Sequence, residues 1–569
     1  MKMKKINNGE INESFLEKEI EVYGWVQQHR NFGKLTFIDL RDESGIIQIV
    51  VNDLEQKISN ESVIKVTGIL KNRKDVNEKI KTGKFEIIAS ELEVLNYAQE
   101  LPFVIDDNNH VKEELSGKYR YLELRKPKSH DILVKRFHMI KAMRNKLEEK
   151  GFIEIETPIL AKSTPEGARD FLVATRKAGH FYSLPQSPQL FKQLLMSSGF
   201  EKYYQVARVF RDEDGRKDRQ PEFSQLDIEM SFQSPEILQA IVEETVQAGF
   251  KAVGIDIKIP FQRMDYDHAI KYYGSDKPDL RFKYLIEDAS MFFTNSEFNI
   301  ISKKQNIKLI ASDHLITKKD HKFLEQVVKK NGANILWYFN VENGDLKDTN
   351  FAKKDLESVN KIIKHYQAST KSFLIVAEDN YEKTQQALGA VRNELNLLFK
   401  LSSDDKYKFT WIVNWPLFEY DEKTDTYGPA HHAFTMYDKD TLVNGELDFV
   451  KTRARAYDLV LNGFEAAGGS ERIYSYDIQR KIFEKIGLTD EQIENQFGFF
   501  INSFKYGLPP HCGIAFGLER MIMIATKSES IRDVIAFPKN SKAQDLLTGS
   551  PSEVTKEQLD EVFLEIKSK

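Results

Sequence analysis

The sequence predicts an α+β protein with a small N-terminal β-barrel, a larger domain built on an antiparallel sheet, and an α/β domain inserted into the larger one. Three observations support this prediction. The first hundred residues contain five short stretches of β-strand character, residues 203–232 and 454–473 are each typical of a hairpin, and residues 284–405 form a distinct lysine- and asparagine-rich segment. No internal repeat interrupts this order.

Length and composition limit the function classes. The chain has 569 residues, 41% of them hydrophobic, which is enough for a large core and for about three or four domains. It contains no apolar run of about 18 residues and no signal peptide after MKMKK, so we expect a cytoplasmic protein. The single Cys512 excludes an internal disulfide and a zinc site made of several thiolates. A net charge of −5 restricts nucleic-acid contacts to local patches.

The predicted barrel comes first along the chain. Its five strand candidates are IEVYGWVQQ, KLTFIDLRD, GIIQIVV, SVIKVTGIL and KFEIIASELEVL. In the second, a period of two places one set of side chains inside (Thr36, Ile38, Leu40) and another outside (Leu35, Phe37, Asp39, Arg41). Phe37 is then either a chance surface aromatic or a platform for stacking a nucleobase. In the second case, Gln48 and Glu86 on neighbouring strands would read base edges.

A helix and a strand open the larger domain. The helix is predicted from His130 to Lys150 and ends at Gly151. Its apolar stripe is predicted to consist of Leu133, Phe137, Ile140 and Leu147. The next stretch, FIEIETPIL, is typical of a strand that stops at Pro158.

A second helix is predicted over SPQLFKQLLMSSG. Ser187 is its expected N-cap, Pro188 its first residue, and Gly199 lies past its end. The helical period places Gln189, Lys192 and Gln193 on adjacent turns of one face.

The first hairpin, YYQVARVFR with EFSQLDIEMSF, encloses the charged loop RDEDGRKDRQP. Such loops are often merely solvated. A second hairpin favours a functional interpretation, because Asn462-Gly463 is a two-residue turn that pairs Leu461 with Phe464 and Val460 with Glu465. Asp458 then lies diagonally from Glu465 on one face, where two close carboxylates would repel unless they share a cation such as Mg²⁺.

Phosphate binding is expected at this sheet. Arginine forks at nearby strand ends suit phosphates, and the chain contains no GxxxxGK[ST] loop. The two hairpins therefore predict a nucleoside triphosphate held against an antiparallel sheet.

Several motifs resemble those of the class II aminoacyl-tRNA synthetases. FRDED…RQPEF resembles motif 2, GIAFGLERMIMI resembles motif 3, and FIEIETPIL resembles motif 1, which forms the dimer interface in that family. Other segments resemble the aspartyl-specific group of bacterial type, which has an insertion between motifs 2 and 3. They are TPEGARDF, SPQLFKQ, GSDKPDLR, HHAFT, GGSERI and FPKNSKAQDLLTGSPS. The resemblance covers nearly the whole chain.

The resemblance implies a domain order. Residues 1–107 would be an OB-fold anticodon-binding domain, 108–128 a hinge, 129–283 the first part of the catalytic domain, 284–405 the inserted domain, 406–545 the second catalytic part, and 546–569 a C-terminal extension. It also implies a homodimer, which agrees with an apolar stripe on the predicted helix larger than a small domain needs.

For catalysis, the resemblance implies that Arg211, Glu465 and Arg520 act on ATP, with Arg211 at the α-phosphate and at the substrate carboxylate. Phe223 and Arg520 would enclose the adenine. Mg²⁺ would bind to Asp458 and Glu465. The full implied ATP site consists of Arg211, Asp212, Glu213, Gln220, Phe223, Glu465, Gly517, Leu518, Glu519 and Arg520.

For substrate choice, the resemblance implies an L-aspartate site. Glu166 and Gln189 would face the ammonium group, Lys192, His431 and Arg472 the side-chain carboxylate, Arg211 the α-carboxylate, and Asp227 would orient Lys192. The expected reaction forms aspartyl-adenylate from ATP and transfers aspartate to the 3′ end of its tRNA, whose anticodon would meet Phe37, Gln48 and Glu86.

Two other interpretations stay open. An asparaginyl-type enzyme would share barrel and motifs, but Lys192 and Arg472 would face its neutral amide uncompensated. An inactive tRNA-binding relative would be expected to lack Arg211, Glu465 or Arg520, and all three are present. His431-His432 could suggest a metal site, but adjacent loop histidines more often make polar contacts.

Overall fold

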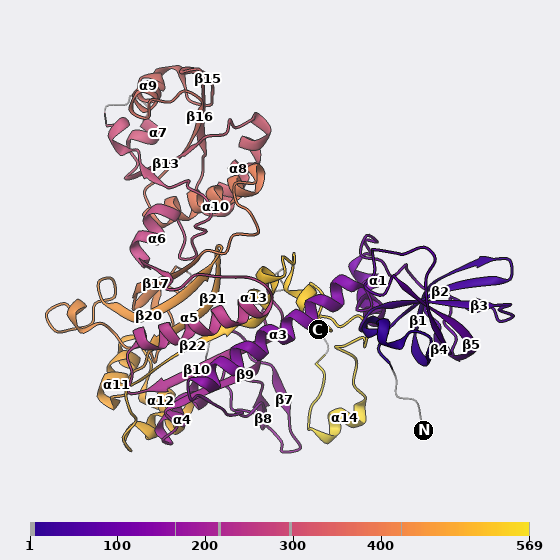
Figure 1. Ribbon diagram of the computed structural model, residues 1–569. Helices are drawn as coiled ribbons and strands as arrows, with labels where there is room; N and C mark the ends of the chain where they lie inside the picture. Colours follow the sequence, from indigo (N-terminus) through magenta and orange to yellow (C-terminus); the bar gives the residue numbers. More distant parts are fainter. Residues whose placement is uncertain (1–5, 165–166, 214–217, 295–298, 423, 568–569) are drawn as a thin grey trace. The chain divides into compact units, whose positions relative to one another are not determined.

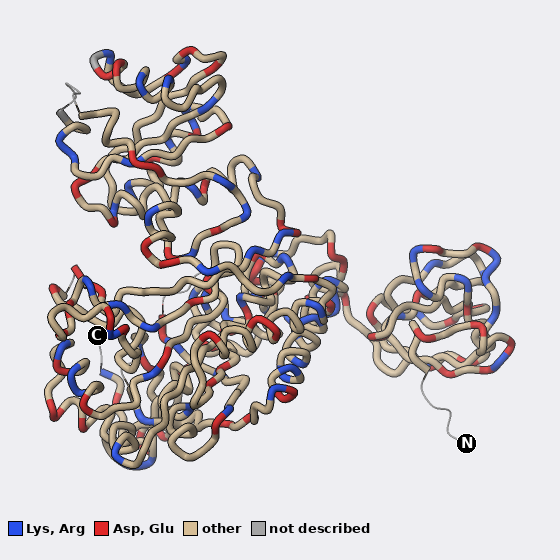
Figure 2. Tube along the Cα trace, turned by 60° about the vertical axis from the view of Figure 1, so that its left-hand side comes forward, with Lys and Arg blue, Asp and Glu red and all other residues tan. Residues whose placement is uncertain are grey.

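The computed structural model describes residues 6–164, 167–213, 218–294, 299–422 and 424–567. They form two compact units, Met1–Leu115 and Ser116–Lys569. Figure 1 shows the elements of both units. Lys and Arg are interspersed with Asp and Glu along the chain (Figure 2), in keeping with the small net charge. None of the helices described is both long and apolar enough to cross a membrane.

The first unit is a closed five-stranded barrel, as predicted. Its strands are β1 (Glu19–Phe32), β2 (Leu35–Arg41), β3 (Ile46–Asn52), β4 (Val63–Asn72) and β5 (Phe85–Asn96), in the order β1-β2-β3-β5-β4. On β2, Thr36, Ile38 and Leu40 are buried inside the barrel and the alternate residues are not, so the predicted faces are confirmed.

The second unit is built on an eight-stranded sheet with the order β11-β17-β20-β21-β22-β10-β9-β6. Its strands are β6 (Ile153–Glu154), β9 (Lys202–Phe210), β10 (Glu222–Ser231), β11 (Gln262–Asp265), β17 (Phe409–Pro416), β20 (Arg453–Leu461), β21 (Phe464–Glu471) and β22 (His511–Gly517). The six central strands are antiparallel, and the edge strands β6 and β11 run parallel to their neighbours. The two predicted hairpins are β9–β10 and β20–β21.

Helices cover both faces of this sheet (Figure 1). One face packs against α3 (Pro127–Glu149), α5 (Pro235–Ala252) and α13 (Leu518–Ala525). The other face packs against α4 (Gln189–Ser197), α11 (Tyr476–Lys485) and α12 (Asp490–Phe504). Because successive strand residues point to opposite faces, every second side chain of a central strand points to the face that α4, α11 and α12 cover.

Two predictions about α3 and its neighbour were wrong in detail. Leu147 is buried and Ile140 packs against the core as predicted, but Phe137 is 57% exposed, and the other buried residues of α3 are Ile132, Met139 and Met143. The methionines face α5, and their flexible side chains fill that contact. The predicted strand FIEIETPIL forms only the short edge strand β6, because the ladder with β9 pairs only Ile153 and Glu154 and the chain then turns away.

Helix α4 begins one residue later than predicted. Gln189 is its first residue, and Pro188 occupies the N-cap position. The Ser187 hydroxyl still accepts the backbone N–H of Gln189 at 3.1 Å. Gly199 follows the helix with φ of +86°, a conformation that glycine adopts without strain.

The inserted segment folds around its own antiparallel sheet, of order β12-β13-β16-β14-β15. The strands are β12 (Glu287–Asp288), β13 (Asn306–Ser312), β14 (Trp337–Glu342), β15 (Asp345–Thr349) and β16 (Lys371–Glu378). One face packs against α8 (Lys318–Lys330) and α10 (Tyr381–Phe399), and the other against α7 (Asn299–Ser302) and α9 (Leu356–His365).

Smaller elements complete the chain. They are α1 (Glu113–Lys118), α2 (Arg120–Glu123), α6 (Tyr266–Tyr273), α14 (Lys556–Glu561), β7 (Leu172–Ala174), β8 (Phe181–Ser183), β18 (Phe418–Asp421) and β19 (Thr426–Pro429).

Candidate active site

Strand β10 delivers two acidic side chains to the sheet face that meets α4. Leu226, Ile228 and Met230 point into the core beneath α3 and α5. The alternate residues Asp227 and Glu229 therefore point the other way, toward α4. Both carboxylates are almost fully buried, so they require cationic partners.

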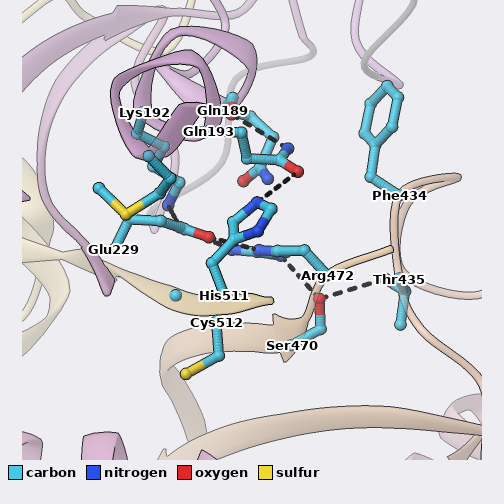
Figure 3. Close-up of polar contacts among 12 residues, drawn as sticks. Gln189, Lys192, Gln193, Glu229, Phe434, Thr435, Ser470, Arg472, His511 and Cys512 are labelled. Carbon is cyan, nitrogen blue, oxygen red and sulfur yellow. Dashed lines mark hydrogen bonds and ion pairs between the residues drawn. The ribbon is translucent and has the colours of Figure 1, made fainter. Parts of the chain in front are cut away.

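The partners are Lys192 from α4 and Arg472, the residue after β21, and the four residues form what we call the charge cluster. Figure 3 shows Lys192, Glu229 and Arg472. Lys192 Nζ lies 2.9 Å from Asp227 Oδ1 and 3.3 Å from Glu229 Oε2. Arg472 donates from Nε and Nη2 to the two oxygens of Glu229, at 2.9 and 3.2 Å. Two cations thus face two carboxylates.

Burial and charge act against each other in the charge cluster. Each of its four residues is at most 1% exposed. Burial opposes ionisation of Glu229, but Arg472 and Lys192 outweigh it and lower the pKa of this carboxyl. For Asp227 burial dominates, and its pKa is raised although Lys192 contacts it. The cluster is a tightly packed group whose members depend on one another.

Histidines surround the charge cluster. His432 Nε2 lies 2.5 Å from Arg472 Nη1, which also donates to the Ser470 hydroxyl at 2.7 Å. His511 on β22 lies 3.2 Å from Gln193 Oε1. Burial lowers the pKa of His511 to about 4 and holds that of His432 well below its usual value. Both imidazoles are therefore neutral near pH 7.

The predicted His431 lies elsewhere in the site. Its Nε2 is 3.5 Å from Asp458 Oδ1, and its ring packs edge-on against Trp415. Burial lowers its pKa to about 4. The structure thus places His432, and not His431, directly against Arg472.

Gly513 on β22 makes room for Glu229. A Cβ atom at this position would lie 1.7 Å from Glu229 Oε2. A side chain larger than hydrogen is incompatible with the observed position of the carboxylate. The space that Arg472 and Glu229 share therefore depends on this glycine.

Two polar atoms beside the charge cluster are unsatisfied. Gln189 Nε2 and Asp227 Oδ2 are buried and have no hydrogen-bond partner among the described residues. A cavity of about 300 Å³ opens at the start of α4, where Gln186, Ser187 and Leu190 line it. Buried polar atoms without a partner are typical of a ligand site, and residues close to Gln189 in the sequence line the cavity. Glu166, also predicted here, lies outside the described residues.

The second hairpin carries the two carboxylates predicted to share a cation, Asp458 and Glu465, which we call the carboxylate pair. The predicted pairing of Leu461 with Phe464 and of Val460 with Glu465 is confirmed, with a bulge before Val460 that the sequence did not reveal. A Cβ atom on Gly468 would lie 3.1 Å from Asp458 Oδ1 and 3.7 Å from Glu465 Oε1. Both side chains thus approach the same point above the sheet.

Lys277 contacts the carboxylate pair. Its Nζ lies 3.1 Å from Glu465 Oε2. Asp458 is more deeply buried, and burial together with the nearby Glu465 raises the pKa of its carboxyl well above the usual range. Its Oδ1 has no hydrogen-bond partner among the described residues. The pair is short of positive charge.

The residues predicted around ATP gather near the first hairpin. The Arg211 guanidinium lies 5.2 Å from the centre of the Phe223 ring. Arg520 donates from Nη1 to the Glu465 carbonyl at 2.6 Å, and its buried Nε has no hydrogen-bond partner in the described part of the chain. Glu213 pairs with Arg219 at 2.7 Å. Residues 214–217 of the charged loop lie outside the described residues.

Other predicted ATP-site residues make structural contacts. Gln220 exchanges two hydrogen bonds with the backbone of Lys539, at 2.8 and 2.9 Å. The Glu519 carboxylate accepts the Ser224 N–H and pairs with Arg136 at 2.9 Å. The backbone N–H of Asp212 donates to the Arg169 carbonyl at 3.1 Å. Leu518 belongs to the core, and a Cβ on the preceding Gly517 would meet open space.

On the barrel, the three predicted tRNA contacts divide into an aromatic and a polar group. Phe37 and Phe32 form an edge-to-face pair with centroids 5.8 Å apart, and Phe32 is 67% exposed. Gln48 donates to Glu86 at 2.7 Å across neighbouring strands. Phe37 itself is half-buried and Gln48 is buried, whereas Phe32 is exposed. Aromatic and hydrogen-bonding side chains are the components of single-stranded nucleic-acid recognition.

Sequence reasoning missed Glu229, His432, His511 and Lys277. Glu229 was detectable, because it lies two residues after Asp227 on the same strand and must share its face. His432 was not, since the choice between two adjacent histidines depends on the loop conformation.

The sequence matches two protein families. Residues 112–541 match the tRNA synthetases class II (D, K and N), and residues 20–95 match the OB-fold nucleic acid binding domain. Relatives include an aspartate–tRNA ligase of Malacoplasma penetrans, 46% identical, and an aspartate–tRNA(Asp/Asn) ligase of Geobacillus sp., 44% identical. Each alignment covers 98% of this chain and 98% of the relative.

Solved structures share the fold. An asparaginyl-tRNA synthetase of Pyrococcus horikoshii in complex with asparaginyl-adenylate has a TM-score of 0.60 and 20% identity, covering 94% of this chain and 98% of its own. The aspartyl-tRNA synthetase of Entamoeba histolytica has a TM-score of 0.59 and 20% identity, covering 95% and 92%. The chain therefore belongs to the class II tRNA synthetases of the D, K and N group.

Proposed function

We propose that this chain is an aspartate–tRNA ligase, which activates L-aspartate with ATP, releases diphosphate and transfers aspartate to the 3′ end of aspartate tRNA. The observation that carries the proposal is the charge cluster, where Lys192 and Arg472 lie buried beside the unsatisfied Gln189 amide. Relatives 42–46% identical over nearly the whole chain bear the name aspartate–tRNA ligase.

Hydrogen-bond capacity supports aspartate as the ligand. Lys192 has three N–H groups, and its contacts to Asp227 and Glu229 use two. Arg472 has five, of which four contact Glu229, Ser470 and His432. One N–H remains on each cation. Two charged donors suit the two oxygens of a side-chain carboxylate, whereas the NH₂ group of an asparagine amide would leave a donor facing a donor.

The nucleotide half of the site has complementary chemistry. Phe223 and Arg520 would hold the adenine between a ring face and a planar cation, and Arg211 would bind the α-phosphate and the substrate α-carboxylate. Gln220, Glu213, Asp212, Gly517, Leu518 and Glu519 would complete the ATP site. No protein nucleophile is needed, because the aspartate α-carboxylate attacks the α-phosphorus and diphosphate leaves. The chain's contribution is positioning and charge stabilisation.

Mg²⁺ would bind at Asp458 and Glu465. The unsatisfied Asp458 Oδ1 and the deficit of positive charge fit a cation there. No group of three or more His, Cys, Asp or Glu side chains is placed to hold a metal among the residues described, so ATP and water would have to supply further oxygen ligands. When bound, the ion would neutralise phosphate charge.

The remaining parts of the proposal concern tRNA, assembly and location. Phe37 would stack an anticodon base while Gln48 and Glu86 read base edges. Exposed apolar side chains near motif 1 support a homodimer, and they are Phe137, Ile153, Ile159 and Leu160. A monomer at micromolar concentration in analytical ultracentrifugation would contradict the dimer. Synthesis of aspartyl-tRNA fits the cytoplasmic location expected from the sequence.

ATP–diphosphate exchange with each amino acid in turn tests the activity. We expect exchange with aspartate and little with asparagine. Exchange with asparagine instead would favour the asparaginyl-type interpretation, and silence with every amino acid would favour the inactive tRNA-binding relative.

A further inference from the structure

Arg392, on helix α10 of the inserted segment, is one of the largest buried side chains, with 1% exposure. Its guanidinium donates to three backbone carbonyls, those of Tyr284 at 2.5 Å, Asp279 at 2.8 Å and Phe282 at 3.1 Å. The ring of Phe282 lies 3.9 Å from the guanidinium carbon. One side chain therefore fixes three positions of residues 279–284.

The fixed segment directly follows Lys277, the lysine that contacts the carboxylate pair. Only Pro278 separates Lys277 from Asp279, whose carbonyl accepts a hydrogen bond from Arg392. The same segment packs against the second hairpin, since a Cβ on the turn residue Gly463 would lie 3.3 Å from Asp279 Cβ. Asp279 is also held in a forked pair by Arg281, at 2.7 and 3.0 Å. Residues 277–284 thus connect the hairpin to α10.

Helix α10 is itself firmly seated beside α6 (Figure 1). A Cβ on Gly389 would lie 2.4 Å from the Gly274 carbonyl oxygen, so the two backbones are in direct contact. Gln385, one turn earlier on α10, donates to the Lys271 carbonyl at 3.1 Å. A rigid helix therefore presents Arg392 to the segment.

We infer that Arg392 is a positioning residue for Lys277, and that through it the inserted domain helps to build the nucleotide half of the site. This inference rests on the proposed function. The geometry provides a continuous path from α10 through Arg392 to residues 279–284, and from there to Lys277 and Glu465. Without the guanidinium, three carbonyls lose a charged donor and the segment is free to shift. Lys277, whose partly exposed ammonium can attract the triphosphate, is then no longer held at the site, and ATP with Mg²⁺ binds less well.

The alternative is that Arg392 only stabilises the junction between α10 and the rest of the unit. Gln385 provides the matched control, because it lies on the same helix and donates to a carbonyl at the same junction, but its hydrogen bonds go to Lys271 and Tyr381. If Arg392 acts through Lys277, replacing both residues should have no more effect than replacing Lys277 alone.

The test measures full-length protein carrying Arg392→Met, Arg392→Lys, Lys277→Met, Gln385→Leu and the Arg392→Met/Lys277→Met pair. Binding of ATP with Mg²⁺ is followed by calorimetry, and exchange kinetics give KM for ATP and for aspartate. We expect Arg392→Met to weaken ATP binding about tenfold with KM for aspartate changed less than about twofold. Arg392→Lys should be intermediate, and Gln385→Leu should bind ATP like wild type.

Three results would overturn the inference: additive losses in the paired variant, equal rises in both KM values, or the same loss in Gln385→Leu. If Arg392→Met does not fold, the double-mutant cycle is measured with Arg392→Lys instead, alone and paired with Lys277→Met. The wild-type exchange profile separately decides the proposed function. ATP binding still tests Arg392 if a different amino acid, or none, supports exchange.

Discussion

The charge cluster and the carboxylate pair lie on the same sheet face but differ in how far the chain itself balances their charges. In the charge cluster, Lys192 and Arg472 contact two carboxylates, and all four side chains are buried. In the carboxylate pair, Lys277 contacts Glu465 but not Asp458, and the side chains of Lys277 and Glu465 are each more than a third exposed.

This difference indicates which of the two groups needs a ligand to balance its charges. The charge cluster is preassembled, so its cations are held in place before an amino acid arrives. The carboxylate pair remains electrostatically unfavourable until another cation joins it. Under the proposed function, amino-acid specificity is therefore built into the folded chain, whereas nucleotide binding completes the carboxylate pair. Four experiments test this contrast, from the largest expected effect to the smallest.

The largest effect is expected from Arg472→Leu. Removing one member of a buried charged pair costs about 2–5 kcal/mol, or very roughly thirtyfold to several thousandfold in kcat/KM for aspartate. Asparagine lacks the charge and should lose much less. Exchange kinetics with both amino acids measure the change in preference.

The same substitution leaves Glu229 buried without its guanidinium, which is strongly destabilising. The double variant Arg472→Leu/Glu229→Gln is therefore the control that separates specificity from folding. ATP binding should persist in both, since the predicted ATP contacts are Arg211, Phe223 and Arg520. An unchanged ratio of aspartate to asparagine activity would refute the assignment of the specificity pocket.

Two glycines, one in each half, should respond differently to the same change. In Gly513→Ala, the new methyl would displace the Glu229 carboxylate, 1.7 Å away, and we expect a loss of about 3 kcal/mol or more in the free energy of unfolding. In Gly468→Ala, the methyl would lie 3.1 Å from Asp458 Oδ1 and requires only a small shift. That variant should stay within about 1 kcal/mol of wild type but show a higher KM for ATP.

Chemical denaturation and exchange kinetics distinguish the two outcomes. Equal destabilisation by both alanines would show that the carboxylate pair is as tightly packed as the charge cluster. The contrast between the halves would then not hold.

A smaller effect is expected from Phe37→Ala, which lies in the barrel and not in the domain of the eight-stranded sheet. Stacking one base contributes about 1–3 kcal/mol, so tRNA charging should fall roughly fivefold to 150-fold while ATP–diphosphate exchange is unchanged. Phe32→Ala is the matched control, because Phe32 is the aromatic neighbour of Phe37. Equal losses in charging and exchange would indicate that Phe37 only stabilises the barrel.

The smallest effect, taken for each pH unit, concerns acid stability. Burial lowers the pKa of His511 to about 4. The nearby Glu229 opposes this shift, whereas the positive charges of Arg472 and Lys192 add to it. The unfolded chain therefore binds a proton that the folded chain does not between about pH 6.5 and 4, and stability should fall with pH by at most about 1.4 kcal/mol per pH unit for this group.

The variant His511→Asn should show a shallower loss of unfolding free energy over that pH range. Denaturant titrations at several pH values measure the slope, with the exposed His180→Asn as control. A slope identical to that of wild type would show that His511 is not the group that titrates.

The sequence predicted the parts of the structure that depend on local periodicity. The barrel strands and both hairpins follow from a period of two and from turn residues such as Asn462-Gly463. The stripe of α3 was misassigned, because which side of a helix is buried depends on its partner, here α5. Among site residues, Lys192 and Arg472 were predicted from motif resemblance. Arg392 could not be found, since its carbonyl partners are more than a hundred residues away along the chain.

The inserted segment occupies the connection between β11 and β17, which are parallel neighbours. Parallel strands always need a crossover of a dozen or more residues, so the sheet demands a long connection at this place whatever it contains. The crossover is therefore a natural point at which evolution or an engineer can exchange one module for another without altering strand order. A replacement module would need an anchor for residues 279–284, because the present one provides Arg392 there.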